Sequence, residues 1–167
     1  MEKNGRATKS TTVKYFFDTN ILLYRFDTSE SHKMAIAADL IDRCLLDRSF
    51  RVSTQVMMEF YSVATRKLLH AVTPASAAGV IAGWSRYDPV TITPSLIIEA
   101  AAIHQRHSFS WWDSTIVAAA VAAGCDVLYS EDMQHGRDFD GLEIQNPFRT
   151  TLRVNEPRST YGVKKRR

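Results

Sequence analysis

Four acidic residues that are far apart in the sequence each occupy a position where an α/β protein gathers functional groups. Asp18 and Asp132 follow short apolar runs that predict buried strands, whereas Glu59 and Asp113 lie near the starts of predicted helices. The carboxyl ends of parallel strands, and the starts of the helices that follow them, meet at one edge of a sheet. We therefore expect these four carboxylates to converge.

Clustered carboxylates repel one another, and a buried carboxylate is costly unless a positive charge compensates it. No Lys or Arg stands beside any of the four acids in the sequence. A divalent cation is the natural compensation, and a ligand set made only of oxygens suits Mg²⁺ or Mn²⁺. Such an ion can activate water and stabilise the charge that develops when a phosphodiester is attacked. The pattern thus predicts metal-dependent hydrolysis of phosphodiester bonds.

Each acid taken singly also has a plainer structural interpretation. Asp18 could be an Asx turn or a helix N-cap, and Asp113 could be an ordinary helix cap. Glu59 could be a solvated helix residue, and Asp132 could belong to a surface loop. The catalytic role is therefore predicted from the four positions together.

Short apolar runs alternate with helical patterns along the chain. The apolar runs predict five strands, at residues 13–17, 50–53, 89–92, 126–129 and 142–144. Apolar residues at helical spacing predict five helices, at residues 31–46, 54–70, 74–87, 94–107 and 113–123. Residues 130–140 are expected to form a polar loop. Strands separated by helices predict an α/β fold with a parallel sheet that is covered on both faces.

Four segments resemble, in the same order, the acidic motifs of the PIN domain family. They read YFFDTNILLY (15–24), STQVMMEFY (53–61), SWWDSTIVAAA (110–120) and LYSEDMQHG (128–136). The later segment GLEIQNPF (141–148) also fits, so the resemblance covers about residues 13–148. One such motif would be a weak signal, but four in order are specific. The small single-domain form resembles the VapC-type toxin of toxin–antitoxin pairs.

The resemblance implies a PIN-like three-layer fold with a five-stranded parallel sheet, and an endoribonuclease that depends on Mg²⁺ or Mn²⁺. It assigns catalysis and metal binding to Asp18, Glu59, Asp113 and Asp132. Asn20 and Ser130 match accessory polar positions beside the first and the fourth acid. Glu131 could share or exchange the role of its neighbour Asp132, although the alignment with the family favours Asp132.

The resemblance also implies partners. The substrate would be RNA, with single-stranded loops as targets, because splayed bases and bent backbones suit a narrow acidic cleft. An antitoxin protein would insert a segment into or near the cleft, where its Arg or Lys could displace the metal. A homodimer is implied as well.

Charge is unevenly distributed along the chain, whose net charge is +3. Residues 1–14 carry four cations against one anion, and residues 149–167 carry seven against one, which leaves residues 15–148 with a net charge of −6. Basic tails can neutralise phosphates, bind an acidic partner or simply be solvated. We therefore divide the chain into a basic flexible N-terminal extension (1–12), a PIN-like nuclease domain (13–148) and a basic C-terminal tail (149–167).

The sequence favours a cytoplasmic protein that does not contact membranes. Its N-terminus lacks the apolar segment of a secretion signal, and its longest apolar run, around residues 116–123, is far shorter than a membrane span. Cys44 and Cys125 lie far apart in apolar surroundings, without the spacing of a zinc site. We expect both to be reduced core residues.

Two further pairs of residues could take part in chemistry. His104 and His107 are three residues apart on a predicted helix, but no third metal ligand stands at a matching spacing, so we expect structural roles. Trp111 and Trp112 precede the third acid. We expect both indoles to pack in the core, although one could stack on an unpaired base.

Three other functions are less consistent with the sequence than a ribonuclease. A non-catalytic RNA-binding PIN module would gain nothing from clustered negative charge that faces phosphate. A structure-selective DNA nuclease would use the same metal chemistry, but such enzymes typically carry extra helices for which this chain is too short. A phosphatase with an Asp nucleophile needs a second Asp two residues later, and Asn20 occupies that position after Asp18.

Overall fold

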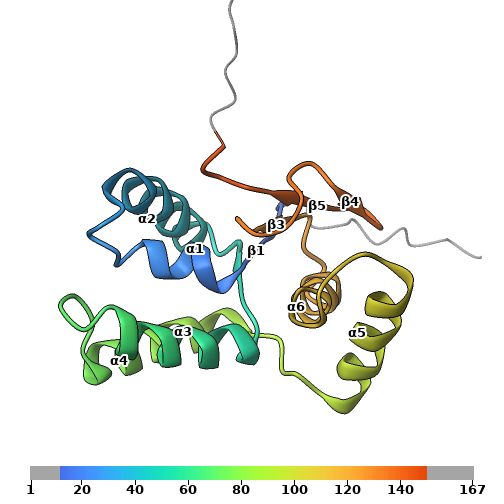
Figure 1. The fold of residues 1–167 in the computed structure, drawn as a ribbon, viewed down its shortest axis with the longest axis horizontal. Helices are drawn as coiled ribbons and strands as arrows, with labels where there is room; N and C mark the ends of the chain where they lie inside the picture. Colours follow the sequence, from blue (N-terminus) through green and yellow to red (C-terminus); the bar gives the residue numbers. More distant parts are fainter. Residues whose placement is uncertain (1–11, 150–167) are drawn as a thin grey trace, which may run out of the picture.

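The computed structural model describes residues 12–149, so the two predicted basic tails lie almost entirely outside the described part. Five short strands form one sheet in the order β2-β1-β3-β5-β4 (Figure 1). Their bounds are Tyr15–Phe17 (β1), Phe50–Arg51 (β2), Val127–Tyr129 (β3), Asp138–Phe139 (β4) and Leu142–Gln145 (β5). In the part of the sheet that carries the candidate site, β1 pairs in parallel with both β2 and β3.

The sheet is mixed, so the prediction of a wholly parallel sheet was wrong. β3 pairs in parallel with β5, but β4 pairs with β5 in antiparallel orientation. The two strands are joined by Asp140 and Gly141, whose φ angles of 51° and 86° are both positive. Positive φ at both central residues is the requirement of a tight hairpin turn, and Asp-Gly is a typical sequence for it. This hairpin supplies the edge strand β4 within residues 130–140, for which the sequence predicts a polar loop.

The predicted strand at residues 89–92 contributes only one isolated parallel bridge, between Val90 and Ser53. Helix α3 begins at Thr54, directly after Ser53, so the neighbouring chain leaves the extended conformation before a ladder can form. The structure has five strands, as predicted, but β4 takes the place of the predicted strand at residues 89–92. The prediction that helices cover both faces of the sheet stays a prediction.

Six α-helices and one short 3₁₀ helix accompany the sheet within residues 12–149. Their bounds are Thr19–Tyr24 (α1), Ser31–Leu46 (α2), Thr54–Lys67 (α3), Pro74–Trp84 (α4), Ser85–Tyr87 (the 3₁₀ helix), Pro94–Arg106 (α5) and Trp111–Ala122 (α6). Figure 1 shows α1 between α2 and α3, α4 alongside α3, and α5 paired with α6. Helix α1 was not predicted, because six residues are too few to display helical periodicity.

Side-chain caps determine where the longer helices begin. Ser53, Thr73, Thr93 and Ser110 are the N-caps of α3, α4, α5 and α6, and each hydroxyl accepts a hydrogen bond from a backbone N–H in the first turn. The cap at Ser110 starts α6 at Trp111, two residues before the predicted start. Asp113 is therefore the third residue of the helix rather than its first.

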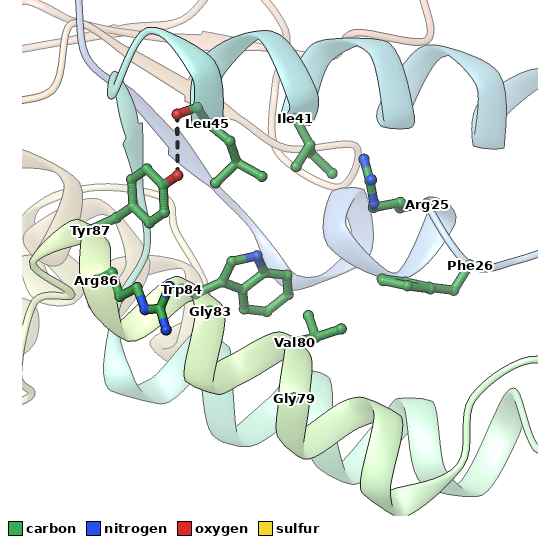
Figure 2. Close-up of a pocket in the computed structure, with 10 residues that line it drawn as sticks. All are labelled: Arg25, Phe26, Ile41, Leu45, Gly79, Val80, Gly83, Trp84, Arg86 and Tyr87. Atoms are coloured by element: carbon green, nitrogen blue, oxygen red, sulfur yellow. Dashed lines mark hydrogen bonds between the residues drawn. The ribbon is translucent and has the colours of Figure 1, made fainter.

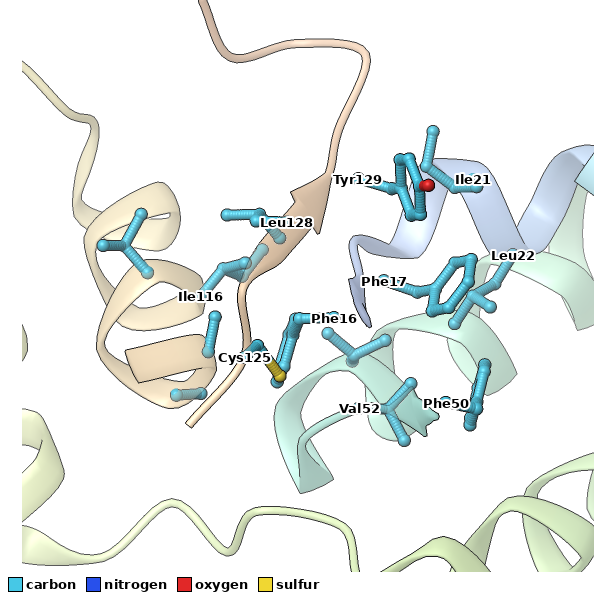
Figure 3. Packing of buried hydrophobic residues seen from close by; sticks show 14 of the residues in the cluster. Phe16, Phe17, Ile21, Leu22, Phe50, Val52, Ile116, Cys125, Leu128 and Tyr129 are labelled. Carbon is cyan, nitrogen blue, oxygen red and sulfur yellow. The ribbon is translucent and has the colours of Figure 1, made fainter. Parts of the chain in front are cut away.

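The core lies between the sheet and the helices (Figure 3). Phe16, Phe17 and Phe50 from β1 and β2 are fully buried, and the rings of Phe17 and Phe50 stack with their centroids 5.0 Å apart. Burying side chains of this size stabilises the fold by roughly 1.5–3 kcal/mol each. The strand ends that carry the polar residues are thus held on a rigid base. Cys44 and Cys125 are buried and free, as predicted.

A hollow of about 320 Å³ lies between α2 and α4, away from the predicted acids (Figure 2). Trp84 lines it, and the hydroxyl of Tyr87 donates a hydrogen bond to the carbonyl of Leu45 at 3.2 Å. None of the four acids is among its lining residues.

Across residues 12–149, no helix is both long enough and apolar enough to cross a membrane.

Candidate active site

Asp18, the first acid, is fixed by hydrogen bonds of its backbone N–H and of both carboxylate oxygens. It directly follows β1, and its backbone N–H donates to the carbonyl of Tyr129 at the end of β3, at 3.0 Å. Its carboxylate caps α1 by accepting from the N–H of Thr19 at 2.6 Å. The other carboxylate oxygen accepts from the hydroxyl of Ser130 at 2.8 Å. The side chain is only 6% exposed.

Burial raises the pKa of Asp18 to about 6, because the charged form loses its contact with water. The hydrogen bonds from Ser130 and Thr19 oppose this shift, and the negative charges of Asp132 and Asp113 add to it. The third and fourth predicted acids therefore lie within electrostatic reach of the first. No cation is among the main causes of this shift, and none of the four acids forms an ion pair within residues 12–149, so the negative charge around Asp18 lacks compensation there.

Glu59 is connected to Asp18 through the intervening Thr19. The hydroxyl of Thr19 donates to one carboxylate oxygen of Glu59 at 2.7 Å, while the Thr19 N–H donates to Asp18. The amide nitrogen of Gln55, one turn earlier on α3, donates to the other Glu59 oxygen at 2.9 Å. Gln55 is 5% exposed, and its amide oxygen has no partner among the described residues. Both oxygens of Glu59 are thus oriented by neutral donors.

Asp132 is connected to the next residue along α1. The side-chain amide of Asn20 donates to its carboxylate. The loop that carries Asp132 is also fastened by Ser130, whose hydroxyl accepts from the N–H of Met133 at 3.3 Å while donating to Asp18. The consecutive residues Asp18, Thr19 and Asn20 thereby engage three separate parts of the predicted site. Both accessory residues taken from the resemblance, Asn20 and Ser130, contact acids.

Glu131 faces a different set of partners from its neighbour Asp132. One of its carboxylate oxygens accepts from the hydroxyl of Tyr24 at 2.6 Å, and the other forms an ion pair with Lys33. Burial acts to raise the pKa of Glu131, but the hydrogen bonds from Lys33 and Tyr24 outweigh it and lower the pKa. Because Lys33 compensates the charge of Glu131 while the charge of Asp132 acts on Asp18, the geometry favours Asp132 over Glu131 as the fourth acid.

Asp113 lies in the first turn of α6, and its N–H donates to the cap hydroxyl of Ser110 at 3.1 Å. The prediction that Trp111 and Trp112, the two residues before Asp113, both pack in the core was wrong. Trp111 is 36% exposed and Trp112 is 62% exposed. Both residues precede the buried segment of α6, which begins at Ser114.

The donors at this site are chemically suited to a hard divalent cation. Within residues 12–149, the groups that hydrogen-bond to the carboxylates of Asp18, Glu59 and Asp132 are neutral hydroxyls and amides. Within residues 12–149, no group of three or more Asp, Glu, His or Cys side chains is positioned to hold a metal ion. Mg²⁺ needs few protein ligands, since it keeps several waters and binds through one or two carboxylates together with substrate phosphates. The uncompensated charge at Asp18 fits such an ion.

Sequence reasoning missed two residues of this network, Thr19 and Gln55. Each lies inside a motif that was singled out for its acid, but neither residue type indicates by itself that it will contact Glu59. The two histidines have structural partners: a ring nitrogen of His104 lies 2.9 Å from the carbonyl oxygen of Phe109, and the ring of His107 packs edge-on against that of Phe139. Within residues 12–149, neither histidine is hydrogen-bonded to any of the four acids.

Replacing Thr19 by Val should weaken metal binding by about 10- to 100-fold, the usual effect of removing a group that orients a metal ligand. Valine keeps the shape of the side chain but removes the donor to Glu59. The concentration of Mn²⁺ that supports half-maximal cleavage measures the effect. Thr65→Val is the matched control, because its hydroxyl donates to the carbonyl of Tyr61 within α3. Equal Mn²⁺ requirements in the two variants would contradict the assigned role of Thr19.

Comparison with known proteins adds two findings. The family model of the PIN domain matches residues 15–138. Among solved structures, the chain is similar to Mycobacterium tuberculosis VapC20, described as a sarcin–ricin loop cleaving toxin, with a TM-score of 0.54 and 18% sequence identity over 71% of this chain and 90% of that one. At this identity the similarity concerns the fold. A comparison with curated proteins found no significant match.

Proposed function

Because the chain belongs to the PIN domain family, we propose that it is an endoribonuclease that depends on Mg²⁺ or Mn²⁺, with Asp18, Glu59, Asp113 and Asp132 as its catalytic and metal-binding residues. The observation that carries the proposal is the electrostatic state of Asp18. A buried carboxylate whose pKa is raised to about 6 beside two further acids is ionised at neutral pH at a cost in free energy, and a bound cation would offset that cost. Perturbed carboxylates of this kind concentrate at functional sites.

The residues of the chain would prepare the site in three ways. Ser130 and the Thr19 N–H hold the Asp18 carboxylate by both oxygens, so it cannot rotate away from its neighbours. Thr19 and Gln55 orient Glu59 in the same manner. Asn20 connects Asp132 to α1 and thereby fixes the distance between the ends of β1 and β3. When bound to the four acids, the metal would supply an activated water and charge stabilisation for phosphodiester attack.

We further propose that the protein is the toxin of a VapBC-type toxin–antitoxin pair that acts in the cytoplasm, with helices on both faces of its sheet and a homodimeric assembly. The proposal rests on the four ordered motifs and on the fold shared with VapC20, whose described target is the sarcin–ricin loop. An antitoxin that delivers an Arg or Lys to the four acids would compensate the same charge as the metal. Binding of metal and of antitoxin would then compete.

Incubating the purified protein with total RNA and Mg²⁺ or Mn²⁺ tests the proposed activity. We expect discrete RNA fragments that disappear when EDTA is added, and no fragments from single-stranded or flapped DNA of matched length. Cleavage of DNA instead would indicate a structure-selective DNA nuclease. RNA binding without cleavage under either metal would indicate a non-catalytic module.

Removing residues 150–167 should leave the fold intact and weaken RNA binding mainly at low salt. The deletion removes six cations and one anion from a chain whose residues 15–148 are acidic. Each phosphate contact that is lost lowers the slope of log affinity against log salt by about 0.7 for a single strand. Thermal unfolding and RNA titrations at two salt concentrations measure both effects. Loss of cooperative unfolding would show instead that the tail packs on the body.

A further inference from the structure

Trp112 is an exposed indole beside an acidic site. With 62% of its surface exposed, it is among the most exposed large hydrophobic side chains of the described part. Leaving a side chain of this size in water forgoes roughly 1.5–3 kcal/mol of burial free energy. A single exposed apolar residue is ordinary on most surfaces. Its position next to Asp113 is what gives it a functional meaning.

The neighbouring indole has a structural role that Trp112 lacks. The ring of Trp111 packs edge-on against the ring of His104, with the centroids 6.2 Å apart, and its carbonyl accepts from the hydroxyl of Thr115. Among residues 12–149, Trp112 takes part in no ring–ring or cation–π contact. The fold therefore uses Trp111 and leaves the face of Trp112 available.

A nucleotide at the acidic site would lie within reach of this indole. Only residues 123–126 separate α6 from β3, so the helix runs back beside the strand and its first turn lies at the edge where β3 ends and Ser130 contacts Asp18. The charge of Asp113 acts on Asp18, in agreement with this placement. Consecutive helix residues point about 100° apart, so the indole of Trp112 flanks the Asp113 carboxylate on the same turn. A base next to a phosphate bound at Asp113 could stack on this ring.

We propose that Trp112 is a base-stacking contact that holds an unpaired nucleobase of the RNA beside the acidic site. The proposal rests on the proposed ribonuclease function and adds a preference for single-stranded substrate. Every base has a π face, so stacking tolerates different sequences. A base inside a duplex already stacks on its neighbours and cannot offer that face to a side chain.

Binding measurements in an inactive background test the contact without cleavage. The parent protein is the full chain carrying Asp18→Asn, in Mg²⁺, titrated with one fluorescently labelled 12-nucleotide RNA either single-stranded or annealed to its complement. Adding Trp112→Ala should weaken single-strand binding by about 5- to 150-fold, the usual range for one lost stacking contact. Duplex binding should change by less than about twofold. A merely structural role would lower both affinities together.

Two further variants make the result specific. Trp112→Phe keeps an aromatic face and should retain most of the single-strand affinity, but it should lose the part of the tryptophan emission that RNA quenches. Trp111→Phe, the control on the adjacent residue, should leave affinity and quenching nearly unchanged. Equal single-strand affinity in parent and Trp112→Ala would overturn the proposal, as would a change of oligomeric state by light scattering in place of a change in affinity.

Cleavage by the protein with its natural Asp18 separates this proposal from the proposed function. If that protein cuts RNA in Mn²⁺ while Trp112→Ala in the inactive background binds as tightly as the parent, the enzyme assignment stands and the stacking contact is refuted. If RNA is bound with the expected Trp112 dependence but is never cut, the stacking contact stands and the proposed nuclease fails.

Discussion

Asp18→Asn should reduce RNA cleavage by about 1,000-fold or more while the protein stays folded. Asparagine keeps the shape of the side chain but removes the negative charge that would hold the metal. Metal ions contribute several kcal/mol of transition-state stabilisation, and each 1.36 kcal/mol corresponds to a factor of ten in rate. Fragment formation from a defined RNA, measured over time in saturating Mn²⁺, gives the ratio of rates.

The local hydrogen bonds should survive this substitution. The amide oxygen of Asn can accept from the Thr19 N–H, and the hydroxyl of Ser130 can rotate to accept from the amide nitrogen. Removing one charge from a group of like charges should also leave the metal-free protein at least as stable as before. Circular dichroism and thermal unfolding in EDTA check that the variant is folded.

Asp126→Asn is the matched control for this experiment. Asp126 precedes β3, at the opposite end of the strand from the acids, and its carboxylate accepts from the N–H of Lys14 at 2.8 Å. An Asn oxygen can accept the same bond, so we expect full activity. Equal rates in Asp18→Asn and Asp126→Asn would remove Asp18 from the chemistry. A large loss of metal-free stability in Asp18→Asn would mean that the carboxylate serves the fold.

The proximity of Asp18 and Asp132 could be predicted from the sequence, because parallel strands end at a common edge of the sheet. Asp18 and Asp132 are more than 100 residues apart, yet the Asp18 N–H is hydrogen-bonded to the end of β3 and Asn20 reaches Asp132. The apolar runs before each acid determined this outcome, since buried strands must pair in the sheet. Their catalytic role stays a prediction that the Asp18 experiment tests.

Contacts between side chains of different elements could not be predicted in the same way. Thr19 bonds Glu59 from a helix only six residues long, whose existence depends on the cap at Asp18 and on packing against α3. Gln55 appears in the sequence as an ordinary polar residue on a helix, and only the tertiary structure buries it. These partners follow from the distances between packed helices, which periodicity does not encode.

Two errors in the predicted fold have separate causes. The antiparallel hairpin depends on positive φ at Asp140 and Gly141. The Asp-Gly dipeptide is a sequence signal for such a turn, but the surrounding polar residues favour a loop. Trp112 is exposed because it precedes the buried segment of α6, which begins at Ser114. Whether an indole at a helix entry is covered depends on the elements that pack against that turn, which the local sequence does not encode.

The second large effect concerns the metal-free protein, which should become less stable as pH rises from about 4 to about 6. Burial, the largest cause, raises the pKa of Asp18 from 3.8 to about 6, so the folded state holds this proton more tightly than the unfolded chain. Below pH 3.8 both states bind the proton, and above pH 6 neither does. Between these values the unfolded state releases the proton first, and folding becomes less favourable.

The expected loss is about 3 kcal/mol, because one pKa unit corresponds to 1.36 kcal/mol. Urea unfolding in EDTA at several pH values from 4 to 7 measures it, with Asp18→Asn as the reference that cancels every other titrating group. The free energy of unfolding of the variant should exceed that of the natural chain by an amount that grows across this range.

Saturating Mn²⁺ should reverse the trend for the natural chain, since a cation stabilises the ionised carboxylate and binds only to the folded state. A constant difference between the two proteins from pH 4 to 7 would show that Asp18 is ionised at no cost, and the argument for a metal at this position would lose its electrostatic basis.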